Sequence, residues 1–440
     1  MTTTGDKSTP VHFDRHAPEY ISRFEEITHQ LHGGCPIAWT DAWGGHWVAS
    51  GYKEVFELAR HGSLLSNDHD VHHERQGYQG ITIPNPAGRD ARGGFLEMDP
   101  PEQRDWRRAI DPYLSPAAVN RWKPMVDDLT RACIDERIEL GTIDFVDHLA
   151  NIVPAIATLA LMGLPLVDWT VYCEPAHAQV YTRPDSPDIL RVVEMSRLTQ
   201  QKLLEGIQAC RRQPRPGMIQ GLVEAQILGA PASDSDIRDT LGLLIGGGFD
   251  TTTALTAHSL EWLSEHPDDR ARLRSELPDL IDVATEEFLR YYTPAPGDGR
   301  TVTCNYEVSG KHLEEGDRLW LSWAMANRDP AVFDEPDVVK IDRRHNRHTS
   351  FGLGVHRCIG SNVARAVFKS MLAAVLERLP DYVCDPGGAV HYDTVGVING
   401  MKHLPATFTP GPRLAAGLDE TIAHWQRVID DEGLARPVTR

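Results

Sequence analysis

The longest uninterrupted helical pattern in the chain covers residues 234–264, and it constrains the fold more than any other segment. The pattern ends before His266 and Pro267. At a rise of 1.5 Å per residue, roughly thirty residues form a rod of about 45 Å, which is long enough to cross an entire domain. The chain is therefore expected to be built mainly of helices.

The segments around this rod predict a mainly α fold with a minor β region. The segment MDPPEQRDWRRAI begins a helix that Asp99 can cap. From there to about residue 292 the pattern is almost wholly helical, whereas residues 300–340 are strand-like. A final long helix is expected from Ser361 to Leu379.

No segment divides the chain into separate domains. Pro- and Gly-containing stretches are scattered, and no repeat of fixed period occurs. Hydrophobic residues at 41% and charged residues at 24% are typical of one folded body. We therefore predict a single domain over residues 1–440, with a variable segment at 1–34 and an appended segment at 411–440.

Composition argues against several classes of partner. The chain has 44 basic and 63 acidic residues, for a net charge of −19, so nucleic acid and anionic lipid would be repelled. The seven cysteines form no CxxC pair, which favours a reducing compartment. The N-terminus shows no signal peptide, and the most apolar run, residues 152–167, is too broken to span a bilayer. We expect a cytoplasmic protein that binds neither nucleic acid nor membrane.

A glycine-spaced loop, FGLGVHRCIG at residues 351–360, leads into the last long helix. A cysteine at the start of a helix experiences the positive end of the helix dipole and unpaired N–H donors. Both favour the thiolate, which is the form that binds metal. Cys358 is therefore a candidate metal ligand, although a single cysteine considered alone is more often a buried structural residue.

The other residues of this loop favour a bulky ligand next to Cys358. Glycines 352, 354 and 360 have no side chains, so a flat group can lie against the backbone. His356 and Arg357 would supply hydrogen-bond donors for carboxylates beside it.

The whole loop resembles the ligand loop of the cytochrome P-450 superfamily, Phe-Gly-x-Gly-x-His-x-Cys-x-Gly. The resemblance implies a haem-thiolate monooxygenase, with haem b (iron protoporphyrin IX) between the long helix and the cysteine loop. It also implies that Cys358 is the axial ligand, that Phe351 packs under it and that Gly360 belongs to the cofactor site. A thiolate ligand donates electron density to iron and favours O–O cleavage.

The middle of the long helix reads GGGFDTTT at residues 246–253. Each glycine in a helix interior costs about 1 kcal/mol relative to alanine, so a run of three indicates that something packs closely there. Close packing between helices is the alternative. The string resembles the oxygen-side helix of the family, which implies that Gly247 and Gly248 make room for dioxygen. Asp250 and Thr251 would then relay protons.

The resemblance also covers a second short motif, Glu287-Phe288-Leu289-Arg290. Oppositely charged residues three apart on a helix usually form a weak surface pair. The family carries a buried Glu-x-x-Arg pair at this place in the chain order. It implies that Glu287 and Arg290 are structural residues that support haem incorporation.

The strings DPPEQR and DGR occur at matching places in the camphor-hydroxylating bacterial member of the family. Arginine suits bidentate recognition of carboxylates. The residues carried over to the cofactor site are Gln103, Arg107, Asp298, Arg300 and His356. Arg107, Arg300 and His356 are the expected donors to the haem propionates.

The same resemblance predicts a substrate pocket lined mostly by apolar residues, between the loop near residues 81–96 and the long helix. Such a lining favours a hydrophobic small molecule, for example a terpenoid, a branched lipid or fatty acid, or a steroid-like compound. The predicted lining residues are Leu96, Leu243, Leu244, Gly247, Pro294, Ala295, Val397 and Ile398.

Electrons are expected from a separate protein, because the chain has no flavin motif and no iron–sulfur cysteine spacing. We predict a ferredoxin-type donor on the cysteine side of the haem, with NAD(P)H acting only through the redox partners. Arginines could form a basic patch for an acidic ferredoxin there. They are Arg104, Arg107, Arg108, Arg347 and Arg357.

Three other functions fit part of the sequence. A peroxide-driven haem-thiolate enzyme is disfavoured, because Asp250 and Thr251 are present. A haem-binding sensor would have no use for an oxygen-side helix. A zinc site formed by His69, His72, His73 and Glu74 is the third alternative, although such loop histidines are more often solvated.

Overall fold

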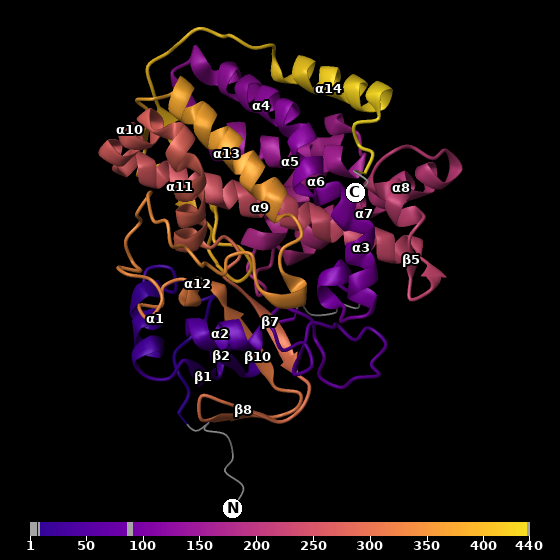
Figure 1. The fold of residues 1–440 in the computed structure, drawn as a ribbon, viewed down its shortest axis with the longest axis vertical. Helices are drawn as coiled ribbons and strands as arrows, with labels where there is room; N and C mark the ends of the chain where they lie inside the picture. The colour runs from indigo at the N-terminus through magenta and orange to yellow at the C-terminus, as the bar shows by residue number, and fades with distance from the viewer. Residues whose placement is uncertain (1–6, 8, 86–90, 438–440) are drawn as a thin grey trace, which may run out of the picture.

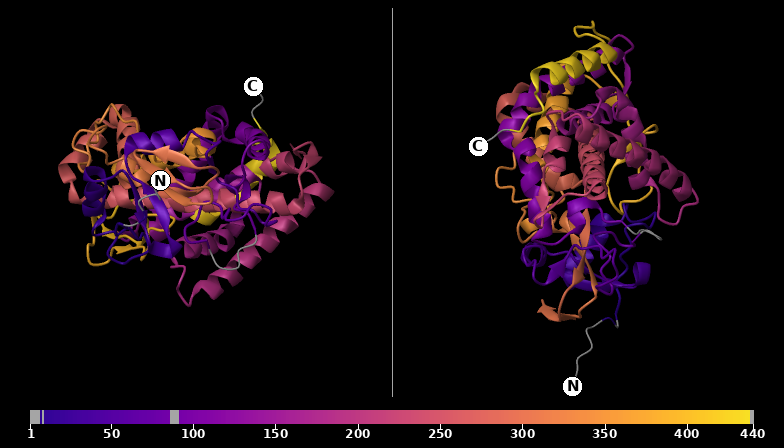
Figure 2. Two further views of the ribbon diagram at one scale, coloured as in Figure 1. Left: turned by 90° about the horizontal axis from the view of Figure 1, so that it is seen from below. Right: turned by 90° about the vertical axis from the view of Figure 1, so that its right-hand side faces the viewer.

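The computed structural model describes residue 7, residues 9–85 and residues 91–437. Helices fill one part of the molecule and a five-stranded sheet lies beside them, near the N-terminus of the chain (Figures 1 and 2). The predicted fold class, mainly α with a minor β region, is confirmed.

The long helix α9 (Asp234–Glu265) is confirmed and runs through the middle of the molecule (Figure 1). The Ser233 hydroxyl caps it by accepting a hydrogen bond of 3.1 Å from the amide of Asp236, and the next helix starts at Pro267. Its neighbours are α5 (Ile152–Met162), α6 (Trp169–Tyr181) and α7 (Ile189–Arg212). Because α5 is buried at every position, it forms a core helix and not a surface one.

The remaining helices surround this centre. Short one-turn helices connect several of them, and η2 (Gly94–Glu97) and η5 (Gly354–His356) lie next to predicted site residues. The longer elements are α1 (Phe24–Gly33), α2 (Tyr52–Leu58), α3 (Glu102–Leu114), α4 (Pro116–Ile138), α8 (Met218–Val223), α10 (Pro267–Ser275), α11 (Leu277–Tyr292), α12 (Trp323–Ala326), α13 (Ser361–Arg378) and α14 (Leu418–Glu432).

The main sheet has the strand order β1-β2-β10-β7-β3, and all its pairs are antiparallel except β2 with β10. Successive side chains of a strand point to opposite faces, so Asp298 and Arg300 of β7 lie on the same face. The five strands are β1 (Ile37–Thr40), β2 (His46–Ala49), β3 (Leu65–Ser66), β7 (Gly297–Val302) and β10 (Arg318–Ser322).

In the described part of the chain, three of the four smaller sheets are two-stranded hairpins, and the fourth, β11-β14-β4, joins segments that are distant in sequence. The hairpin β12–β13 matters most for the site, because it lies against α9. The other small sheets are β11-β14-β4, β5-β6 and β8-β9. Their strands are β4 (Thr142–Asp144), β5 (Gln226–Ile227), β6 (Ala230–Pro231), β8 (Tyr306–Val308), β9 (Lys311–Leu313), β11 (Val383–Cys384), β12 (Val390–His391), β13 (Met401–His403) and β14 (Pro405–Thr407).

The predicted capping role of Asp99 is wrong. Helix α3 begins at Glu102, and no side chain caps it. The Asp99 carboxylate instead accepts hydrogen bonds from the Ser66 hydroxyl and the amide of Asn67, at 2.5 and 3.0 Å. The N-cap position is Pro101, and the backbone carbonyl of Asp99 accepts a hydrogen bond of 3.1 Å from the amide of Gln103. The Asp99 carboxylate therefore connects the start of α3 to β3.

The last helix, α14, lies along α4 (Figure 1). Trp425 donates a hydrogen bond of 3.2 Å to Asp128 of α4, and Gln426 accepts one of 2.8 Å from the amide of Leu166. The segment therefore packs on the helical part of the molecule. The division of the chain into one domain with segments at 1–34 and 411–440 stays a prediction.

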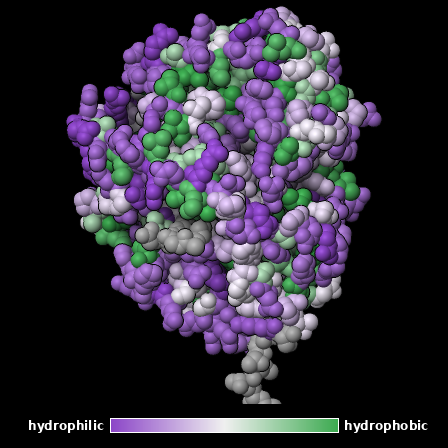
Figure 3. Space-filling view, turned by 180° about the vertical axis from the view of Figure 1, so that it is seen from behind, coloured by the Kyte–Doolittle hydropathy of each residue, from purple (hydrophilic) through white to green (hydrophobic). Residues whose placement is uncertain are grey.

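Hydrophilic side chains cover most of the face seen in Figure 3, with apolar groups scattered among them. Within the described ranges, none of the helices combines the length and the hydropathy needed to cross a membrane.

Candidate functional site

The cysteine loop is held in shape by its glycines and by one backbone hydrogen bond. Gly352 and Gly354 have φ values of 64° and 70°, in the left-handed region that favours glycine. A Cβ on Gly354 would lie 2.4 Å from the carbonyl oxygen of Ala59. The amide of Cys358 donates to the carbonyl of Phe351 at 2.7 Å, so the loop folds back on itself just before α13.

The thiol of Cys358 faces an interior space. It is accessible, yet burial raises its pKa, and both are true of a side chain that faces a hollow inside the protein body. A hydrogen bond from the amide of Gly360 and the charges of Arg107 and Arg357 act in the opposite direction. A metal ion would deprotonate such a thiol outright, so the residue has the chemistry expected of a ligand.

Two neighbours of this thiol were also predicted. A Cβ on Gly360 would lie 4.0 Å from the sulfur of Cys358, so this glycine is close to it. The ring of Phe351 is half-buried, and the Arg365 guanidinium lies 4.4 Å from its centroid.

The glycines of α9 have different surroundings. A Cβ on Gly247 would meet nothing within 4 Å, although this helix crosses the interior, so open space lies beside it. A Cβ on Gly248 would lie 2.6 Å from the hydroxyl oxygen of Thr158 on α5. Gly247 therefore borders open space, whereas the small size of Gly248 is needed for packing between helices. For Gly248 this differs from the role that the resemblance implied.

Asp250 and Thr251 follow these glycines but point to different partners. The hydroxyl of Thr251 donates to the carbonyl of Gly247 at 2.8 Å. Asp250 is fully buried, and its Oδ1 atom contacts both Nδ1 of His177 on α6 and the hydroxyl of Tyr392 just after β12. Its Oδ2 atom has no partner within the described residues.

The charges of this cluster balance one another. Burial alone would lower the pKa of His177, but hydrogen bonds to Asp250 and Cys173 raise it to about 10. His177 is therefore positively charged at neutral pH and compensates the buried carboxylate. Burial followed by the charge of Asp250 raises the pKa of Tyr392, which keeps its hydroxyl protonated. Neither partner of Asp250 was found from the sequence.

The three predicted propionate donors, Arg107, Arg300 and His356, come together. Burial first, and then the charges of Arg300 and Arg107, lower the pKa of His356 to about 3, so these cations lie near its ring. The Nδ1 atom of His356 is buried and has no partner among the residues described. A ring nitrogen that can donate, beside two cations, fits an anionic group such as a carboxylate.

The other contacts of this cluster fix its members in place. Arg107 donates to the carbonyl of Arg357 at 2.9 Å, and Arg300 to the carbonyl of Gly299 at 2.7 Å. Gln103 donates to the carbonyl of Val355 at 2.8 Å, so α3 is tied to the cysteine loop. Asp298 accepts a hydrogen bond of 3.1 Å from the indole of Trp323 and lies 4.0 Å from Arg300.

The Glu287–Arg290 pair of α11 is fully buried. Its two hydrogen bonds are 2.8 and 2.9 Å long, and Arg290 also donates to the carbonyls of Asn327 and Val338 at 3.0 Å. Arg343 adds a third charge at 3.0 Å from Glu287. This network attaches α11 to the segment that precedes the cysteine loop.

The structure exposes only part of the predicted substrate lining. Leu96, Leu243, Leu244 and Ala295 are half-buried, and Gly247 and Val397 are exposed. Pro294 and Ile398 are buried, so the structure does not place them on an open surface. Residues 86–90 of the predicted pocket loop lie outside the described residues.

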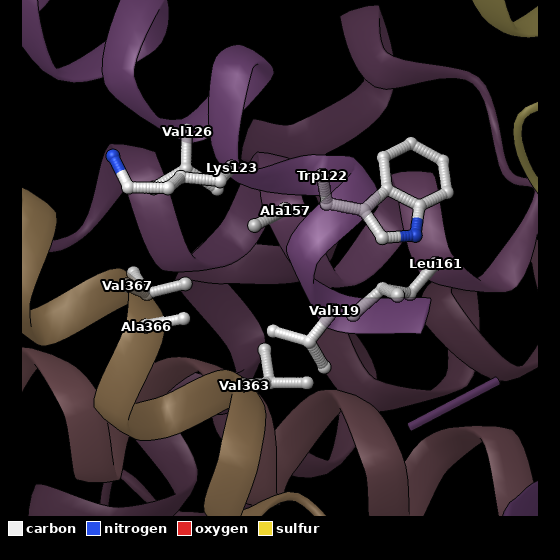
Figure 4. Close-up of a pocket in the computed structure, with 9 residues that line it drawn as sticks. All are labelled: Val119, Trp122, Lys123, Val126, Ala157, Leu161, Val363, Ala366 and Val367. Atoms are coloured by element: carbon white, nitrogen blue, oxygen red, sulfur yellow. The ribbon is translucent and has the colours of Figure 1, made fainter. Parts of the chain in front are cut away.

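A separate apolar pocket lies between α4, α5 and α13 (Figure 4). It contains none of the predicted site residues. Its lining residues are Val119, Trp122, Lys123, Val126, Ala157, Leu161, Val363, Ala366 and Val367.

The predicted basic patch is partly exposed. Arg104, Arg108, Arg347 and Arg357 are exposed and Arg107 is half-buried. Arg108 pairs with Asp105 at 3.0 Å.

The structure does not support the zinc alternative. His69 is buried and lies 3.9 Å from Glu97, whereas His72, His73 and Glu74 are exposed. In the part of the chain that the structure describes, the side-chain groups suited to a metal ion are found elsewhere.

Comparisons with known proteins agree with this geometry. The family model described as cytochrome P450 matches residues 188–385. A vitamin D3 dihydroxylase of Streptomyces griseolus is 28% identical over 82% of this chain and 87% of its own length. A 20-oxo-5-O-mycaminosyltylactone 23-monooxygenase of Streptomyces fradiae is 32% identical over 68% of this chain and 70% of its own length. A solved structure of a Mycobacterium marinum cytochrome P450 in complex with pseudoionone has a TM-score of 0.82 and 23% identity, covering 91% of this chain and 99% of that one.

These matches show that the chain belongs to the cytochrome P450 family. It is an oxidoreductase of the monooxygenase type, and its cofactor is haem b.

Proposed function

We propose that this cytochrome P450 inserts one oxygen atom from O2 into a hydrophobic small molecule, with Cys358 as the ligand to the haem iron. The observation that carries the proposal is the accessible but interior thiol of Cys358 at the start of α13, next to the cations of the predicted propionate site. Haem bound through a thiolate supplies the activation of oxygen.

The haem carboxylates would be held by Arg107, Arg300 and His356. The two arginines offer planar groups with several donors, and the unpartnered ring nitrogen of His356 can donate once its tautomer places the proton there. Gln103 and Asp298 would orient this cluster, through the Val355 carbonyl and the Trp323 indole respectively.

Proton delivery is assigned to Thr251 and Asp250. The Thr251 hydroxyl is partly accessible and lies one helical turn from Gly247, where open space adjoins the helix. The carboxyl group of Asp250 lies deeper in the protein, against His177 and Tyr392, and its Oδ2 atom has no partner within the described residues. General acid catalysis needs such a group within reach of the reacting oxygen, directly or through one water.

The substrate would contact the half-buried leucines of α9 and η2 beside Gly247. An apolar lining of this kind favours terpenoid, lipid or steroid-like compounds. The Streptomyces relative named for vitamin D3 gives a starting point for a panel of such compounds.

A ferredoxin is the proposed electron donor, with its reductase oxidising NAD(P)H, and we place the enzyme in the cytoplasm. The exposed arginines around the cysteine loop support this partner, since opposite charges speed association. We do not expect nucleic acid or membrane as partners, given the net charge of −19.

The absorption spectrum of the reduced protein under carbon monoxide tests the ligand assignment. We expect a strongly red-shifted Soret band, and its replacement by the band of imidazole-ligated haem in the Cys358→His variant. Cys304→Ser, at an exposed cysteine away from the loop, is the control and should leave the band unchanged. A wild-type band at the imidazole position would overturn the assignment.

Substrate and partner need a second experiment. Spin-state shifts of the haem-loaded protein identify bound compounds, and product formation is then measured with ferredoxin, reductase and NADPH. Turnover that proceeds with peroxide but never with the ferredoxin system would contradict the proposed use of O2.

A further inference from the structure

Three side chains lie close together where the β12–β13 hairpin packs against α9, outside the proposed haem site. His258 and Glu261 belong to α9, and His391 ends β12. One carboxylate oxygen of Glu261 lies 3.4 Å from Nε2 of His391, and the other lies 4.0 Å from Nδ1 of His258. One ligand atom from each residue lies within 4.8 Å of the others, so a single ion can reach all three after small shifts.

The hydrogen bond of His258 determines which ring nitrogen is free. Its Nε2 atom lies 3.2 Å from the carbonyl oxygen of Asn399, and a carbonyl can only accept, so Nε2 carries the proton. Its Nδ1 atom then directs a lone pair toward the Glu261 carboxylate, and two electron-rich groups face each other.

The side chain of Glu261 is paired with histidines. Within the described ranges this carboxylate forms ion pairs with His258 and His391 and with no lysine or arginine. The ring of His258 stacks on Tyr292, with centroids 4.9 Å apart and an angle of 9° between the planes, which fixes its orientation. Two imidazoles and one carboxylate carry a net charge of −1 when the imidazoles are neutral.

We propose that His258, Glu261 and His391 bind one divalent transition-metal ion, with Zn²⁺ as the best-matched class. Imidazole and carboxylate are ligands of zinc, and three protein ligands leave a fourth tetrahedral position for water. The Asn399 carbonyl has the supporting role that is usual for the second nitrogen of a ligating histidine.

The ion would link β12 to α9 and would therefore affect the neighbouring hydrogen bond between Tyr392 and Asp250. Tyr392 follows His391 directly and donates to Asp250, two helical turns before His258 on α9. Fixing His391 against α9 restrains the strand that positions Tyr392. The metal site itself does not depend on the proposed function.

Calorimetric titration of the metal-depleted, haem-loaded protein with ZnCl2 tests the site. We expect one equivalent of Zn²⁺ to bind. The affinity should fall about 100-fold in each of the separate variants His391→Ala and Glu261→Gln, because removing even a residue that only supports a metal ligand lowers metal affinity by up to about that factor. Both positions are partly exposed, so the variants should fold, and the carbon monoxide spectrum checks that they do. His266→Ala, at an exposed histidine next to α9, is the matched control and should bind like the wild type.

A second cluster, formed by Asp144, Asp147 and His403, must be distinguished. Its variant Asp147→Asn should leave the titration unchanged. Hydrogen exchange of residues 388–400 should slow on addition of Zn²⁺ in the wild type and not in His391→Ala. No binding, binding that survives both ligand variants, or binding lost in Asp147→Asn would each overturn the proposal.

Discussion

The hydroxyl of Tyr392 donates a hydrogen bond of 2.7 Å to Oδ1 of Asp250, a residue 142 positions earlier in the chain. His177 contacts the same oxygen from α6, so two distant segments hold one buried carboxylate on α9. Because a buried charge needs partners to be stable, the position of Asp250 depends on both of them.

Removal of the tyrosine hydroxyl should weaken this arrangement. We expect Tyr392→Phe to lower the free energy of unfolding by about 1–3 kcal/mol, since a buried acceptor loses a donor. Product formation should slow more than substrate binding weakens, because Asp250 acts on proton delivery. Denaturant unfolding and steady-state kinetics measure the two effects. Tyr181→Phe, whose ring lies 5.6 Å from that of Tyr392, is the control, and an equal effect there would contradict the role of the hydroxyl.

Stability should depend on pH through His177. Its pKa is raised from 6.5 to about 10 in the folded protein, so its contribution is fully present below pH 6.5 and is lost as the pH rises through about 10. We expect the wild type to lose stability between pH 7 and 10 more steeply than His177→Gln. Unfolding free energies at several pH values provide the measurement. Parallel profiles for the two proteins would show that His177 does not stay charged.

Two Glu-x-x-Arg pairs of this chain have opposite surroundings. Glu287 and Arg290 are fully buried, whereas the side chains of Glu194 and Arg197 on α7 are 74% and 72% exposed. We expect Arg290→Met to destabilise the protein by about 3–5 kcal/mol, because it leaves a buried carboxylate with fewer partners. Arg197→Met should cost less than about 1 kcal/mol. Denaturant unfolding and haem content measure both variants, and similar losses would refute the distinction.

Much of this site could be predicted because its signals are local in sequence. The cysteine loop, the glycines of α9 and the Glu-x-x-Arg pair are each contiguous strings whose spacing already implies their geometry. His177 and Tyr392 could not be found in this way, since each meets Asp250 only through tertiary packing. For Asp99 a local signal was misleading. Its position before α3 predicted a helix cap, but its carboxylate instead accepts hydrogen bonds from Ser66 and Asn67 at β3.

The basic patch should affect electron transfer and not folding. We expect Arg108→Glu to slow ferredoxin-dependent reduction about tenfold at low salt, because complementary charge mainly raises the association rate. The difference should shrink at high salt, where exposed charges are screened. Stopped-flow reduction measures it, with Arg197→Glu as the control on a distant helix. Equal rates for Arg108→Glu and the wild type would remove this surface as the docking site.

Adjacent glycines of α9 should respond differently to the same added methyl group. A Cβ on Gly248 would approach the Thr158 hydroxyl to 2.6 Å, so Gly248→Ala should cost about 1–3 kcal/mol through overpacking. A Cβ on Gly247 meets nothing within 4 Å, so Gly247→Ala should stabilise the helix by up to about 1 kcal/mol. The methyl group would, however, enter the space proposed for oxygen and substrate, and turnover should fall although the protein is more stable. Thermal unfolding and product formation separate these effects. If both variants lost stability equally, Gly247 would not border open space.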